Sequence, residues 1–192
     1  MRVTRTDADR FFEHGLDIGN RVIYMGSVGG EDNGTDYLMA ERMVKSLHIL
    51  AATDAPIEIL MNNHGGCEYA GFAIMDAIRT CPCHVTIKVY GHAMSMGSLI
   101  LQAADERIMA PLSRMMIHYG TWGFCDHPKI VESWTEEGLK IREWMLGYYL
   151  KRIREKKPGF TAKKLDSMLN FDSFLTAQEA VDIGLADRVL NG

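Results

Sequence analysis

One serine stands where the chain could turn it into a nucleophile. Ser95 lies between an alternating strand pattern over residues 85–90 and an apolar helix expected over residues 98–104. A serine hydroxyl attacks well only when a base takes its proton and fixed donors meet the resulting oxyanion. At a helix start, Ser95 would have the positive end of the helix dipole and the Met96 amide beside it. The simpler alternative is a helix-capping serine, because Ala93 occupies the place of the glycine in a nucleophile elbow.

Other positions carry the groups that such a serine would need. His118 ends the apolar run 115–117, and its imidazole could serve as a base. Asp172 could orient that imidazole. Gly65 and Gly66 follow a buried strand, and a residue without Cβ lets its amide approach a carbonyl closely. Each also has a plain structural explanation, as a satisfied histidine, a loop acid or cap, and a tight turn. Taken singly, none of them establishes an activity.

Glycine and proline residues divide the chain into alternating strand and helix patterns, which indicates an α/β fold. Strands are expected over residues 21–25, 57–61, 85–90, 107–110, 115–117 and 188–190. Helices are expected over residues 36–52, 69–80, 98–104 and 129–155, with a short one after Thr161. A capping box, Thr176–Glu179, should open the last helix, which Gly184 should close.

The composition excludes several functional classes. The 192 residues carry a formal net charge of -4, so we expect no nucleic-acid partner and no binding to acidic membranes. The only close cysteine pair, Cys81 and Cys83, lacks the spacing and the second half of a zinc site, so we expect no metal and no cofactor. Residues 1–7 have no signal-peptide core, and no run has the ~18 apolar residues of a membrane span. We therefore expect a cytoplasmic protein with free thiols.

Four motifs, in order, resemble those of the proteolytic subunits of the caseinolytic (Clp) proteases, and the similarity extends from about Asn20 to Val189. They are Asn62–Gly66, similar to the family's Asn-Ser-Pro-Gly-Gly turn; Met94–Gly97, similar to Ala-Ser-Met-Gly; Pro111–His118, similar to Leu-Pro-Asn-Ser-Arg-x-Met-Ile-His; and Asp172–Val181, similar to Asp-Arg-Phe-Leu-Ser-Ala-x-Glu-Ala. The order serine, histidine, aspartate and the spacings agree with the family.

The resemblance implies a crotonase-like α/β spiral of ββα units with a protruding handle, a strand plus a long helix, over about residues 119–157. Residues 1–20 are expected to form a short N-terminal segment and residues 21–192 a single head domain. The implied activity is that of a serine endopeptidase. The implied roles are Ser95 as nucleophile, His118 as general base and then acid, Asp172 as the orienting carboxylate, the amides of Gly65 and Met96 as the oxyanion hole, and Gly66, Cys67 and His64 along the substrate groove.

The resemblance also implies partners: heptameric rings of this chain, stacked as a tetradecamer around a chamber that admits peptides, with unfolded proteins delivered by an AAA+ unfoldase. Two departures bear on these partners. Asn170-Phe171 replaces a charged pair that joins the rings in the family, and Glu58 and Leu60 replace tyrosines that help to form the unfoldase docking pocket. Two alternative functions are a catalytically silent ring subunit that supports a paralogue and a crotonase-type acyl-CoA hydrolase or hydratase.

Overall fold

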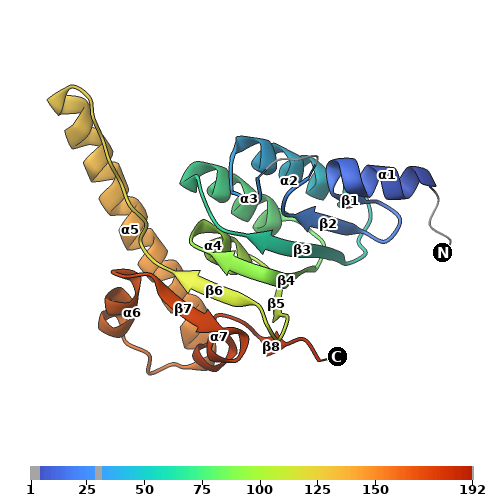
Figure 1. Ribbon diagram of the computed structural model, residues 1–192. Coiled ribbons are helices and arrows are strands. Elements are labelled where there is room, and N and C mark those ends of the chain that lie inside the picture. The colour runs from blue at the N-terminus through green and yellow to red at the C-terminus, as the bar shows by residue number, and fades with distance from the viewer. Residues whose placement is uncertain (1–4, 29–31, 192) are drawn as a thin grey trace.

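Eight strands join in one mixed sheet in the computed structural model, which describes residues 5–28 and 32–191 (Figure 1). The strand order is β1-β2-β3-β4-β5-β8, while β6 pairs with β4 and β7 pairs with β6. Residues 1–4 of the expected N-terminal segment, residues 29–31 and Gly192 lie outside the described residues. The expected α/β class is confirmed.

The elements follow one another in alternation. The strands are β1 Leu16–Asp17, β2 Val22–Met25, β3 Ile57–Asn63, β4 Val85–Met94, β5 Glu106–Met109, β6 Arg114–Ile117, β7 Ser173–Thr176 and β8 Arg188–Val189. The helices are α1 Arg5–His14, α2 Tyr37–Leu50, α3 Glu68–Thr80, α4 Met96–Leu101, α5 Pro128–Lys156, α6 Ala162–Leu169 and α7 Ala177–Ile183.

The core forms between the parallel strands and the helices that cover them. Along β3, residues alternate between buried and half-buried positions, as expected for a strand with one face turned to the core. Helix α2 buries Met39, Met43 and Leu47, which recur at helical spacing on one face. The capping box at Thr176 and the left-handed Gly184 at the end of α7 are both present, as predicted.

Three elements were not anticipated from the sequence: α1, β1 and β7. Helix α1 is predominantly polar, and its three apolar residues, Ala8, Phe11 and Phe12, are too few for a periodic pattern to predict a helix. Strand β7 has four residues, none of them fully buried, and it forms by antiparallel pairing with β6. Strand β1 pairs with β2, so the division at residue 20 crosses a paired unit and stays a prediction.

Helix α5 projects from the body, and the segment that follows β6 runs beside it (Figure 1). Only the part of α5 from Gly138 onward buries side chains, ending with Tyr149 and Ile153. The helix half of the expected handle is thus present. The strand half is not, because residues 118–127 pair with no strand in the described part of the chain. The helix beside this segment already uses its backbone groups internally, so it offers no ladder of donors and acceptors.

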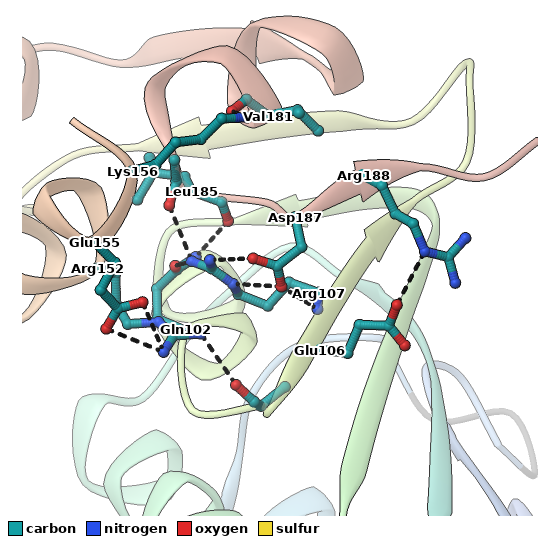
Figure 2. Close-up of polar contacts among 12 residues, drawn as sticks. Gln102, Glu106, Arg107, Arg152, Glu155, Lys156, Val181, Leu185, Asp187 and Arg188 are labelled. Atoms are coloured by element: carbon teal, nitrogen blue, oxygen red, sulfur yellow. Dashed lines mark hydrogen bonds and ion pairs between the residues drawn. The ribbon is translucent and has the colours of Figure 1, made fainter.

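A buried arginine anchors the C-terminal part of the sheet (Figure 2). Arg107 of β5 donates from Nε and Nη2 to the Asp187 carboxylate, at 3.1 and 2.5 Å, and from Nη1 to Gln102 Oε1 and Gly184 O at 2.7 and 3.0 Å. Only 4% of its side-chain surface is exposed. Burial by itself raises the pKa of Asp187, but the hydrogen bonds and charge of Arg107 outweigh it, so the pKa lies below its ordinary value.

Across residues 5–28 and 32–191, we find no helix with the combination of length and apolar character that a bilayer-crossing segment requires.

Candidate active site

The turn from β4 into α4 places Ser95 in an unusual backbone conformation. Its φ of 50° and ψ of -124° lie in a region that a residue with Cβ rarely adopts, at a cost of ~1–3 kcal/mol. Hydrogen bonds of its own backbone hold it there: Ser95 N donates to Met116 O at 2.9 Å, and Ser95 O accepts from Ser98 N at 2.9 Å and from Leu99 N at 3.4 Å. The Ser95 side chain makes no capping bond to α4. The serine therefore stands at the N-cap position without acting as a cap.

The buried hydroxyls of Ser98 and Tyr149 also hold this turn in place. Ser98 Oγ lies 2.6 Å from Ser95 O and 2.6 Å from Tyr149 Oη. A carbonyl can only accept, so the single Ser98 proton goes to Ser95 O, and Tyr149 must donate to Ser98. Burial raises the pKa of Tyr149, which keeps that donor proton in place. The backbone of Ser95 is thus tied through Ser98 to α5.

His118 and Asp172 come together because β6 and β7 pair. Ile117 at the end of β6 lies opposite Ser173 at the start of β7, so the residues just beyond each strand are neighbours. His118 Nδ1 is 2.7 Å from Asp172 Oδ1, and His118 Nε2 is 2.8 Å from Ser95 Oγ. Since an ionised carboxylate can only accept, Nδ1 carries the proton and Nε2 is left to accept from the Ser95 hydroxyl. The three predicted residues therefore form one continuous hydrogen-bonded line.

Of the two glycines beside Ser95, the structure favours Gly66 as the hydrogen-bond donor to an oxyanion. The Gly65 amide donates to Asn63 Oδ1 at 2.9 Å, so it is already used, and the expectation that Gly65 supplies an oxyanion donor is corrected. Within the described chain, the amides of Gly66 and Met96 have no acceptor. An asparagine side chain commonly bonds the amide two residues on, and this turn signal was present in the sequence.

Gly65 remains necessary for a different reason. A Cβ on Gly65 would lie 2.6 Å from Ser95 Cβ and 2.9 Å from Met96 N, and the residue has φ +94°. Gly66, with φ +145°, has no room for a Cβ because it would overlap the Thr35 carbonyl oxygen. Gly65 thus allows the turn to approach Ser95 closely, and Gly66 allows the Thr35 backbone to pack against the same turn.

A cleft of about 420 Å³ opens beside Ser95 and His118. Its other walls include Gly66, Cys67, Met96, Tyr119, Trp122 and Met145. Two of the three residues expected along a substrate groove, Gly66 and Cys67, therefore line it. The third, His64, is not among the cleft residues and bonds instead through Nε2 to Asp32 Oδ2 at 3.1 Å. His64 belongs to the surface beside the cleft.

In the part of the chain that the structure describes, no cluster of three or more histidine, cysteine, aspartate or glutamate side chains is arranged to hold a metal ion. All four cysteines are free thiols. Asn170 bonds to Arg142 and Asp166, and Phe171 is exposed, so neither is used in an ion pair.

Comparison with known proteins shows the family of this chain. The sequence profile of the family described as Clp protease matches residues 18–192. A protein named ATP-dependent Clp protease proteolytic subunit from Deinococcus radiodurans is 34% identical over 176 residues, which cover 90% of this chain and 81% of that protein. Proteolytic subunit 2 of the same protease from Pseudomonas aeruginosa is 33% identical, covering 82% and 77%, and subunit 1 from Protochlamydia amoebophila is 32% identical, covering 96% and 86%.

Proposed function

Because this chain belongs to the Clp protease family, we propose that it hydrolyses peptide bonds with Ser95 as nucleophile, His118 as general base and Asp172 as the orienting carboxylate. A serine-type peptidase of the Clp type is what the family and the named relatives indicate. The observation that carries the assignment of residues is the line from Ser95 Oγ through His118 to Asp172, with bonds of 2.8 and 2.7 Å.

The chemistry follows from the protonation states of this line. His118 Nε2 accepts the Ser95 proton as Oγ attacks the peptide carbonyl, and Asp172 stabilises the imidazolium that forms. The imidazolium then protonates the leaving amine as the carbon–nitrogen bond breaks, which leaves an acyl-enzyme on Ser95. A water attacks this acyl group while His118 takes its proton, and His118 returns the proton to Ser95 Oγ as the carbon–oxygen bond to the serine breaks. Strain at Ser95 suits this role, since it directs the hydroxyl into the cleft instead of toward the helix amides.

The oxyanion would be received by the amides of Gly66 and Met96. Both are without an acceptor among the described residues, and both residues line the cleft beside Ser95. Fixed backbone donors stabilise the developing negative charge without having to reorient during the reaction. Met96 acts here through its backbone, so its side chain is free to pack in the core.

We propose for the assembly that this chain forms heptameric rings, stacked as a tetradecamer, and receives unfolded proteins from an AAA+ unfoldase. The names of the relatives, which describe ATP-dependent proteases, support the partner. The chain has no Gly-x-x-x-x-Gly-Lys-Ser/Thr loop of its own for ATP. The free cysteines support a place in the reducing cytoplasm.

Neither alternative function is favoured by an observation. A silent ring subunit needs no aligned proton relay, yet all three side chains are in hydrogen-bond contact. An acyl-CoA hydratase needs no serine nucleophile, and the named relatives are peptidase subunits. The peptidase therefore stands as the conclusion.

The test joins covalent labelling to turnover. We expect a fluorophosphonate probe to label Ser95, and we expect Ser95→Ala to abolish both labelling and hydrolysis of a fluorogenic peptide. Ser133→Ala, at an exposed position on α5, is the matched control. Light scattering on the same samples gives the assembled mass. Full hydrolysis by a purified Ser95→Ala protein, or probe attached elsewhere, would contradict the assignment.

A further inference from the structure

The two residues that complete the line from Ser95 come from different segments. His118 follows β6, whereas Asp172 lies in the short connection between α6 and β7. Asp172 itself is largely exposed, with 61% of its side-chain surface open. Its contact with His118 therefore depends on how the two segments are held together, since little surrounds the carboxylate directly.

One arginine of α5 contacts both segments. The Arg142 guanidinium lies over the Tyr119 ring, 4.0 Å from its centroid, and Tyr119 is the residue next to His118. Arg142 Nη2 also donates to Asp166 Oδ1 at 3.3 Å and to Asn170 Oδ1 at 3.0 Å. Asn170 caps α6 and lies two residues before Asp172. Arg142 thus connects the residue after His118 with a residue two positions before Asp172.

Further bonds close this connection into a network. Tyr119 Oη donates to Asp166 Oδ1 at 2.7 Å, the oxygen that Arg142 also contacts. Tyr119 N donates to Leu169 O at 2.8 Å, which links the segment after β6 to the end of α6. Asn170 Nδ2 donates back to Asp166 O at 2.8 Å. We call Tyr119, Arg142, Asp166 and Asn170 the α5–α6 clamp.

The protonation states of the clamp are fixed near neutral pH. Burial, followed by the hydrogen bond to Asp166, raises the pKa of Tyr119 to about 12. The hydrogen bond from Tyr119 lowers the pKa of Asp166. Tyrosine therefore stays a donor and aspartate an acceptor. The Arg142–Asp166 pair is itself half-exposed and worth little as an isolated ion pair, so the shared acceptor and the stacked ring define the geometry.

We propose that Arg142 is a positioning residue for the catalytic line, holding Asp172 against His118 through the α5–α6 clamp. The inference rests on the proposed function, since it assigns a role toward Ser95, His118 and Asp172. It also means that alignment of His118 with Asp172 is set inside one chain, by a contact of α5 with α6. Arg142 touches neither substrate nor the reacting atoms.

The test compares Arg142→Gln with Tyr119→Phe, which leaves α5 unchanged and removes only the hydroxyl. Arg142→Gln loses the charged hydrogen bonds to Asp166 and Asn170, and we expect its kcat to fall about tenfold. Tyr119→Phe loses one hydrogen bond to Asp166, and we expect its kcat to fall about threefold. KM for a fluorogenic peptide should change less than twofold, and the rate of Ser95 labelling by a fluorophosphonate should fall in parallel with kcat. The double variant should be no slower than Arg142→Gln, because the two changes break the same network.

Controls separate positioning from folding or assembly. Lys151→Gln removes a charge from an exposed position of the same helix and should leave kcat unchanged. Melting temperature and light-scattering mass are measured on each variant. Wild-type kcat in Arg142→Gln, or a loss that follows the assembled mass and is absent from Tyr119→Phe, would overturn the inference while the wild-type peptidase stands. A wild-type protein that neither labels nor hydrolyses would overturn the proposed function, and this inference with it.

Discussion

Two polar clusters each join distant parts of this chain: Arg107 with Gln102, Gly184 and Asp187 (Figure 2), and the Ser95–His118–Asp172 line at the cleft. The buried Arg107 side chain donates hydrogen bonds from Nε, Nη1 and Nη2 to acceptors on Asp187 and Gln102. At the cleft, by contrast, the serine is strained and two backbone amides beside it have no acceptor among the described residues. In the first cluster every side-chain nitrogen of Arg107 has an acceptor, whereas the second keeps hydrogen-bonding capacity for a substrate.

The difference teaches where each cluster acts. Saturated buried contacts stabilise the fold, because removing one partner leaves the other uncompensated. Unused donors at a cleft contribute to catalysis only when charge develops there. Ser98 joins the two regions: its carbonyl accepts from Gln102 Nε2 at 3.0 Å, and its hydroxyl donates to Ser95 O. The rigid cluster thus supports the strained turn.

The largest contrast should come from His118→Ala. We expect kcat for a fluorogenic peptide to fall by roughly 10⁴–10⁶, because the general base is lost, while the free energy of unfolding changes by less than about 1 kcal/mol. Peptide hydrolysis and denaturant unfolding measure the two quantities. His48→Ala, at an exposed position of α2, serves as control. Hydrolysis near the wild-type rate would show that His118 is not the general base.

Arg107→Leu should show the reverse pattern. We expect about 3–5 kcal/mol less free energy of unfolding, because Asp187 and Gln102 lose their buried partner, and kcat per folded molecule within tenfold of wild type. Arg188→Gln breaks the neighbouring exposed pair with Glu106 and should cost under about 1 kcal/mol. Urea unfolding tests both variants. Equal losses for Arg107 and Arg188 would show that saturation and burial do not distinguish the two pairs.

Gly66→Ala tests the unused amide. We expect kcat to fall by about 10²–10³, since the added Cβ displaces the backbone donor away from Thr35. Gly123→Ala, where a Cβ meets nothing within 4 Å, should leave kcat unchanged. The readout is kcat for a small ester and a peptide. A wild-type kcat in Gly66→Ala would show that the Gly66 amide is not an oxyanion donor.

The smallest effect concerns acid pH. The pKa of Asp187 is lowered in the fold, below its ordinary 3.8, so its contribution to stability is present above about 3.8 and is lost as pH falls through the lower folded value. Melting temperature should therefore drop more steeply below about pH 4 in wild type than in Asp187→Asn, whose side chain does not titrate. Identical slopes for the two proteins would show that Asp187 is not linked to this transition.

Much of the fold was predictable because local signals and tertiary packing agree. The alternation along residues 85–90 and the spacing of Met39, Met43 and Leu47 predicted β4 and α2, since both patterns describe a face that must be buried. Strand β7 escaped prediction, because it exists through its pairing with β6. The handle strand was expected from resemblance alone, and residues 118–127 have no strand partner in the described chain.

The site divides in the same way. Ser95, His118 and Asp172 were identified by residue type, order and similarity to a family, whereas the choice between the Gly65 and Gly66 amides required knowing that Asn63 Oδ1 accepts from Gly65. The distances that turn three candidates into one hydrogen-bonded line also appear only in the folded chain.

By itself, then, the order of residues determined the α/β alternation, the strand-to-helix turn that carries the serine, and the types of side chain available for acyl transfer. Tertiary structure decided which amides stay unused, where His64 points its ring, and how Arg142 ties two segments together. The reason is physical: propensity and periodicity act over a few neighbouring residues, whereas a hydrogen bond between positions 23 or 54 residues apart depends on how the whole sheet pairs.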